Sequence, residues 1–313
     1  MARSLAIEIL SALASGRRGG SARHRDDERA AERDFKVRDF ARLEVAGPFD
    51  VEIETGGAPG VRASGPEWAL DSLRVDQDGD HLVIGCDGEC DGDLRVMITV
   101  RELQSVRSCG SGDVSIDRVA GELFGCACSG SGDLSIDEIA VERAKLEAAG
   151  SGDIQIDKIR SNEFEACFMG SGDFSADSIK CAQLKLAMNG SGDAHIEEYR
   201  GEQFKAELAG SGDLAVESLE STMVECSIHG SGDIFIGGGE ASEAKLKTAG
   251  SGDFSAEGLE VEEASVAIYG SGDISACVTD HAEITITGSG DVGITGGAKC
   301  TVRGSGSGEV RCS

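Results

Sequence analysis

Aspartate follows a Gly-Ser-Gly triplet at a fixed spacing of twenty residues, and this is the feature of the sequence most able to do chemistry. The tetrad Gly-Ser-Gly-Asp begins at residue 110 and returns every twenty residues to 270, with later copies at 288–291 and, ending in Glu, at 306–309. The regularly spaced carboxylates are Asp113, Asp133, Asp153, Asp173, Asp193, Asp213, Asp233, Asp253 and Asp273. If equivalent residues stack about 4.8 Å apart, as neighbouring strands do, these carboxylates form a ladder.

Two roles for this ladder follow from its chemistry. Each carboxylate can accept hydrogen bonds from N–H groups of the turn and so cap a backbone corner. Alternatively, the ladder and a second acidic row four residues further on can collect hard cations such as calcium. The second row is Asp117, Asp137, Asp157, Asp177, Glu197 and Glu217. Neighbouring carboxylates repel by about 1 kcal/mol in water at this separation, so either role must offset that repulsion. No other cofactor is expected.

Catalytic residues are not expected. The five histidines, His24, His81, His195, His229 and His281, fall at unrelated positions of the repeat. Enzymes that cleave polysaccharides on repetitive β folds interrupt the repeat to gather paired carboxylates and a basic residue. The repeats between 110 and 270 carry no insertion, so a polysaccharide-acting enzyme is only an alternative hypothesis.

The eleven cysteines suggest packing rather than chemistry. Cys126, Cys128 and Cys226 occupy positions that are apolar in other repeats, so we expect them to be small core residues. Cys86 and Cys90 flank a loop and can form either a disulfide or part of a metal site, but neither a second pair nor histidines stand at zinc-ligand spacing. The overall cysteine pattern favours a reducing compartment.

Alternating apolar residues between the tetrads indicate the elements that would position the ladder. The first and third residues after each Asp are apolar, as in Val114 and Ile116, which is the period of a strand with one buried face. A third apolar position follows three residues later, and a second alternating run, such as Phe204, Ala206 and Leu208, completes the repeat. The spacing that an amphipathic helix needs is absent.

A fixed period of twenty residues with two or three short strands predicts an all-β fold, a single-stranded parallel β-helix, or β-solenoid. We call each turn of about twenty residues a coil. Equivalent residues of successive coils then lie over one another, and six inward columns form one continuous apolar core. We expect right-handed winding, the usual preference for parallel crossovers. We attribute the tetrad glycines to a sharp corner that needs positive φ.

Three regions are predicted along the chain. Residues 1–34 form an N-terminal segment with a short helix and a mobile charged linker, and Glu8 interrupts its apolar stretch, so it is not a clean signal peptide. Residues 35–109 form irregular opening coils, including a hairpin whose turn lies at 76–80. Residues 110–313 form the regular β-helix.

Charge and hydropathy limit the partners. The formal net charge of -28 and the isoelectric point near 4.4 oppose binding to nucleic acid or an anionic bilayer, because both are polyanions. No run reaches 18 apolar residues, so no transmembrane helix is expected. Cations, basic surfaces and neutral glycans are the partners that this charge allows.

The order of elements before the repeats resembles a known bacterial family. An alternating strand passes through Val45-Ala46-Gly47-Pro48-Phe49-Asp50-Val51-Glu52-Ile53, a hairpin ends in Leu82-Val83-Ile84, and residues 96–100 precede the Gly-Ser-Gly-Asp coils. This order, over about residues 35–313, is similar to the family described as putative auto-transporter adhesin, head GIN domain. The resemblance implies a parallel β-helix that is commonly exported to the cell envelope and has no established catalytic residues.

These observations predict a non-catalytic, adhesin-like binding or structural module of a bacterial cell envelope. The expected partner is a glycan or another envelope component. The location implied is the envelope or the cell exterior, while the lack of a clean signal peptide leaves a cytoplasmic location open. The alternative is a self-assembling scaffold, since the last coil, from Thr301 to Arg311, has no obvious cap and an unpaired strand edge favours end-to-end stacking.

Overall fold

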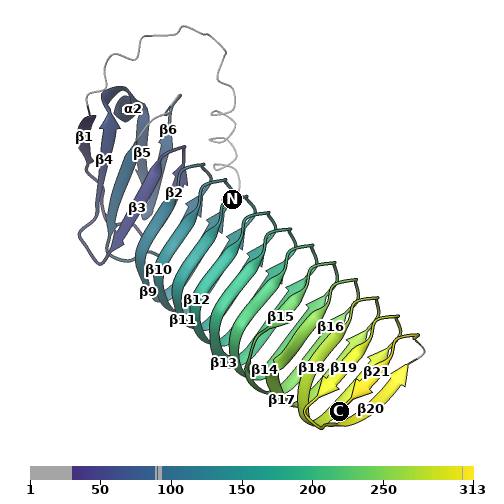
Figure 1. Ribbon diagram of the computed structural model, residues 1–313. Helices are drawn as coiled ribbons and strands as arrows, with labels where there is room; N and C mark the ends of the chain where they lie inside the picture. Colours follow the sequence, from purple (N-terminus) through teal and green to yellow (C-terminus); the bar gives the residue numbers. More distant parts are fainter. Residues whose placement is uncertain (1–29, 89, 91–93, 305) are drawn as a thin grey trace, which may run out of the picture.

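The computed structural model describes residues 30–88, 90, 94–304 and 306–313. The strands form one sheet that winds into a long solenoid, with the early strands gathered at one end (Figure 1). The helix expected near the start of the chain lies outside the described residues. No described helix has the length and hydropathy to cross a membrane.

Regular coils make up the middle of the solenoid. They are β9 (Val114–Cys128), β10 (Leu134–Ala148), β11 (Ile154–Phe168), β12 (Phe174–Met188), β13 (Ala194–Leu208) and β14 (Leu214–Ile228). Each pairs in parallel with the next in a twenty-residue register, so Ile156 lies beside Ala176. The parallel β-helix and its coil length are therefore confirmed. Each coil is a single bent strand of 15 residues, not the two or three short strands expected.

Side-chain burial follows the predicted alternation. In β13 the six expected columns hold Ala194, Ile196, Tyr199, Phe204, Ala206 and Leu208, all buried. A seventh column at the bend contains small residues, including the buried Cys181 and Ala241. Gly201 occupies it beside Tyr199, and a Cβ there would collide with the backbone oxygen of Cys181 and with the Tyr199 hydroxyl. That hydroxyl donates a hydrogen bond to the Gln203 carbonyl at 2.6 Å.

The last coils depart from the regular pattern. β15 (Ile234–Ile236) and β16 (Gly239–Thr248) share one coil that is interrupted at Gly237 and Gly238, and β17 (Phe254–Ile268) is regular. β18 (Ile274–Ile286) is two residues shorter, and its register against β17 shifts. β19 (Val292–Thr295), β20 (Lys299–Gly304) and β21 (Val310–Cys312) end the solenoid, where a disulfide joins Cys300 of β20 to Cys312 of β21.

The opening coils are stacked out of chain order. β2 (Arg42–Ala46) and β3 (Asp50–Thr55) form a coil that lies between two others. On one side it pairs in parallel with β6 (His81–Cys86) and β7 (Arg95–Val100), and on the other with β8 (Ser105–Ser108) and β9. The corner at residues 47–50 therefore stacks against the corner at 110–113, although 63 residues separate Asp50 from Asp113.

Antiparallel strands and a short helix close the N-terminal end, which the sequence did not predict. β4 (Gly60–Pro66) pairs with β7, and β1 (Ala30–Phe35) pairs with β4. β5 (Leu73–Asp78) and β6 form the predicted hairpin. α2 (Glu67–Ser72) connects β4 to β5 and contributes Ala69 and Leu70 to the core. Residues 30–34, assigned from the sequence to a mobile linker, are part of β1.

The prediction that the tetrad glycines need positive φ is wrong. No tetrad glycine is among the residues with positive φ in the described chain. A Cβ on Gly130 would instead collide with the backbone oxygen of Gly110, and equivalent collisions occur at the later corners. Glycine is required there because successive corners stack backbone against backbone, which leaves no space for a side chain.

Candidate functional site

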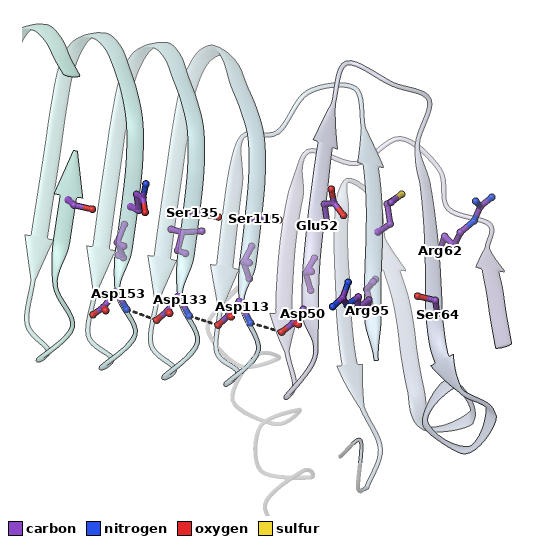
Figure 2. Close-up of a pocket in the computed structure, with 18 of the residues that line it drawn as sticks. Asp50, Glu52, Arg62, Ser64, Arg95, Asp113, Ser115, Asp133, Ser135 and Asp153 are labelled. Carbon is purple, nitrogen blue, oxygen red and sulfur yellow. Dashed lines mark hydrogen bonds between the residues drawn. The ribbon is translucent and has the colours of Figure 1, made fainter. Parts of the chain in front are cut away.

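The aspartates form a hydrogen-bonded chain along the outside of the solenoid. The backbone N–H of Asp133 donates to Oδ1 of Asp113 at 2.9 Å, and the contact repeats up to Asp273 at 2.7–2.9 Å. Figure 2 shows this chain running from Asp153 to Asp50. Three further members lie outside the predicted ladder: Asp50, which the sequence analysis did not include, and Asp291 and Glu309, which end the later tetrad copies. Each lies three residues after a glycine, the spacing of the tetrad.

Each carboxylate supplies an acceptor that the backbone corner lacks. The carbonyl of Asp133 accepts from the N–H of Val114 at 2.8 Å, whereas the N–H of Asp133 points back toward a corner and binds the Asp113 side chain. Charge-assisted hydrogen bonds of this kind are stronger than neutral ones and offset repulsion along the ladder. The ladder carboxylates therefore cap the backbone corners, which is the first of the two roles considered from the sequence. In the described part of the chain, no three His, Cys, Asp or Glu residues lie together as a metal ion would require.

We expect Asp193→Asn to keep or raise the melting temperature, because the amide oxygen still accepts the N–H of Asp213 and repulsion with neighbouring carboxylates falls. Asp193→Ala removes the acceptor and should cost about 1 kcal/mol. Thermal melting with and without millimolar calcium chloride measures both effects. Equal losses for Asn and Ala would contradict the capping role. A calcium-induced rise that Asn reduces would indicate a cation ladder.

The ladder forms one border of a strongly acidic surface. We define the acidic face as the residues at 113, 115 and 117 and their equivalents through 277, which alternate with the buried residues of each coil. The second acidic row forms the opposite border, where Asp117 accepts the N–H of Thr55 at 3.0 Å. The middle row contains mainly small polar residues, and no Lys or Arg occurs on this face.

A groove of about 850 Å³ lies where the acidic face meets the N-terminal strands (Figure 2). The regular coils contribute ladder carboxylates and middle-row polar groups. The N-terminal strands β1, β3, β4 and β7 contribute groups of both charges. The polar lining residues include Asp50, Glu52, Arg62, Ser64, Arg95, Asp113, Ser115, Asp133, Ser135, Asp153, Gln155, Asp173 and Ser175.

Two arginines bring positive charge to this groove. Arg62 on β4 donates from Nε to Oδ1 of Asp34 at 2.9 Å. Arg95 on β7 lies beside Asp50 of β3 in the sheet and beside Ser64 of β4 on its other side. The groove therefore offers donors at its N-terminal end and carboxylate and hydroxyl acceptors along the coils.

Comparison with known families identifies the chain. The family described as putative auto-transporter adhesin, head GIN domain, matches residues 39–198 and 196–298. The chain belongs to this family. The resemblance noted from the sequence is therefore confirmed, and the match covers both the irregular opening coils and most of the regular ones. No curated protein matches the chain.

Several solved structures are similar to this head GIN domain chain. A putative adhesin from Parabacteroides merdae is 17% identical, with a TM-score of 0.40, and the match covers 91% of this chain and 96% of that one. A putative adhesin from Parabacteroides distasonis is 18% identical, with a TM-score of 0.39 and coverages of 92% and 98%. A putative lipid binding protein from Parabacteroides distasonis is 20% identical, with a TM-score of 0.35 and coverages of 91% and 96%.

Histidines do not assemble a catalytic site in the described part of this head GIN domain chain. His81 lies in β6 and His195 on the acidic face, while His229 and His281 lie in or beside later coils. His24 falls outside the described residues. None of them is among the described residues that line the groove. The described lining of the groove offers polar groups and includes no imidazole or thiol.

The cysteines separate into bridged and buried groups. Disulfides join Cys86 to Cys90 and Cys300 to Cys312, and the second pair was not anticipated from spacing. Cys126 and Cys226 are buried, as predicted, and Cys128 is partly buried. Burial raises the pKa of the Cys226 thiol to about 12, so this thiol stays protonated and unreactive. The Cys86–Cys90 bridge is the disulfide alternative that the sequence left open, and the reducing compartment favoured by the cysteine pattern stays a prediction.

Proposed function

We propose that this chain is a non-catalytic, adhesin-like binding module of the bacterial cell envelope, and that its groove binds a hydroxyl-rich glycan. The observation that carries the proposal is the groove itself, where ladder carboxylates, serine hydroxyls and two arginines converge on one cavity. Its volume lies in the range of small-molecule sites, about 300–1,000 Å³.

The lining favours a polyol over other ligands. Sugar hydroxyls can donate to Asp113 and Asp133 in charge-assisted hydrogen bonds and can exchange hydrogen bonds with Ser115 and Ser135. A polyanion would meet the repeated carboxylates of the acidic face and be repelled. Lipid chains are disfavoured because carboxylates and two arginines stand along the lining, and Met97 is its one large exposed apolar side chain among the described residues.

Two further observations support a place at the envelope. The family is named for adhesins, which act at cell surfaces. The two disulfides are typical of proteins that work outside the reducing cytoplasm. Fractionation of the source cells, with detection of the chain by antibody, tests this location, and recovery only in the cytoplasmic fraction would contradict it.

We expect Ser135→Trp to weaken glycan binding at least tenfold, because the indole would fill the groove between Asp133 and Ser115. A glycan array first identifies a ligand, and isothermal titration calorimetry then measures its Kd. Ser255→Trp is the matched control, since Ser255 occupies the same middle row outside the groove and its substitution should leave Kd unchanged. The absence of any array ligand, or equal effects of the two substitutions, would count against the proposal.

A scaffold function by end-to-end stacking stays the second candidate. In the described chain β20 pairs with β18 and β21 pairs with β19, and Val302 of β20 is 52% exposed. The opposite end of the solenoid carries antiparallel strands and α2. End-to-end stacking through the edge of β20 and β21 would join two C-terminal ends. Size-exclusion chromatography over a concentration series tests it, and a monomer at every concentration would exclude it.

A further inference from the structure

A column of charged residues on the narrow face of the solenoid changes sign halfway along its length. The narrow face comprises residues 118–122 and their equivalents, at the bend between the two long runs of each coil. One outward position on it defines the charge column, which is Arg160, Lys180, Arg200, Glu220, Glu240 and Glu260. Neighbours in this column are strand partners in register. Three stacked cations are thus followed by three stacked anions.

The stacking of like charges within each half of the column is unfavourable for the single chain. Like charges directly opposite one another on paired strands are destabilising, so alternating signs would serve the fold better. The cationic half finds acidic partners nearby: Arg160 pairs with Glu138, and Lys180 and Arg200 pair with Glu198. Arg200 also reaches Glu220 at 3.1 Å.

The anionic half lacks comparable compensation. Glu240 and Glu260 form no ion pair with any residue in the described part of the chain, and neither does Glu262 beside them. A groove of about 400 Å³ runs along this half. Small residues, among them Gly201, Ser221 and Ala241, line it between the glutamates. It offers both the space and the charge for long cationic side chains.

We propose that two copies of this chain pair side by side and antiparallel through the charge column, with a twofold axis between Arg200 and Glu220. The axis places Arg200 of one copy opposite Glu220 of the other, Lys180 opposite Glu240, and Arg160 opposite Glu260. Each contact occurs twice, because a twofold interface is self-complementary. The long cationic side chains of each copy enter the glutamate-lined groove of the other.

The rows beside the charge column are compatible with this pairing. The same axis brings each of these rows against itself in reversed coil order. In one row Lys158 then meets Gly258, Ser178 meets Gly238 and Glu198 meets Ser218. In the other row Asn162 meets Glu262, Ala182 meets Ser242 and Glu202 meets Thr222. No like charges oppose one another across these rows.

The contact is narrow and consists of exposed ion pairs, so the dimer is weak and salt-sensitive. Its acidic faces lie outside the contact, and each copy keeps its own groove. Two grooves on one dimer would increase the apparent affinity for a repetitive glycan by avidity. The pairing itself does not depend on the proposed ligand.

Charge reversal tests the proposal. We expect the wild-type chain to sediment increasingly as a dimer with concentration at low salt and as a monomer at about 0.5 M NaCl. R160E/K180E/R200E makes the whole column acidic, and E220K/E240K/E260K makes it basic, so each variant alone should be monomeric. An equimolar mixture of the two variants should recover the dimer. K185E/K205E/K245E lowers the net charge as much as R160E/K180E/R200E does, on a different face, and should behave as the wild type.

Cross-linking tests the register. Carbodiimide cross-linking of a mixture of unlabelled and 15N-labelled protein should yield an intermolecular bond between Lys180 and Glu240, identified by mass spectrometry. Three results would overturn the proposal: a wild-type monomer at every concentration in low salt, failure of the mixed variants to associate, or a dimer cross-linked through β20 and β21. The last result would instead support end-to-end stacking.

Discussion

Gly130→Ala is expected to destabilise the protein by more than about 3 kcal/mol, beyond the usual cost of overpacking. The new Cβ would lie well inside 3.0 Å of the Gly110 backbone oxygen, a separation that real Cβ atoms essentially never show. Backbone atoms on both sides belong to stacked corners, so neither can move without shifting whole coils. Thermal melting followed by circular dichroism measures the loss.

Gly125→Ala, five residues earlier in the chain, provides the control. Gly125 lies in β9, and a Cβ at this position would have no other atom within 4 Å. Lys145 and Ser265 occupy the equivalent position in other coils, so the position accommodates a side chain. Alanine should therefore be neutral or stabilise the fold by about 0.4–1 kcal/mol, since it restricts the unfolded chain. If the two substitutions had similar effects, backbone stacking would not be the reason for the glycine column.

The glycine column also shows what the sequence can and cannot predict. The twenty-residue period and the alternation of residues such as Ile154 and Ile156 were sufficient to predict the parallel β-helix, because both follow from side-chain direction in strands. The reason for each glycine was not predictable in the same way. A turn with positive φ and a close backbone stack both require glycine, and only the three-dimensional spacing of Gly110 and Gly130 distinguishes them.

The candidate groove depends on the part of the fold that has no period. Strands stacked out of chain order place Asp50 beside Asp113 on one side and beside Arg95 on the other. No repeat sets that order, so alternation alone could not show which strands are neighbours. A usable signal was present at Gly47 and Asp50, which match the first and last residues of the tetrad. This spacing would have placed Asp50 in the ladder. It would not have predicted the antiparallel strands that complete the groove.

Deletion of one whole coil, residues 170–189, should give a folded protein, whereas deletion of half a coil, residues 170–179, should abolish folding of the regular coils beyond it. Removal of twenty residues brings the coil of Ile154 against the coil of Ala194 with every column retained. Ile156 then stacks on Ile196, and Phe164 on Phe204. The N–H of Asp193 meets the carboxylate of Asp153, which replaces the partner lost with Asp173.

Removal of ten residues puts every later corner half a coil out of phase. Arg200 would then occupy a position where the stack admits only glycine, and the charged Glu198 would replace Met188 in a buried column. Circular dichroism and limited proteolysis should detect a full strand signal in the first variant and protection confined to the N-terminal coils in the second. Because each coil contacts only its neighbours, the first variant should lose about one coil's share of stability. Equal folding of both variants would mean that neither the glycine column nor the inward columns set the register.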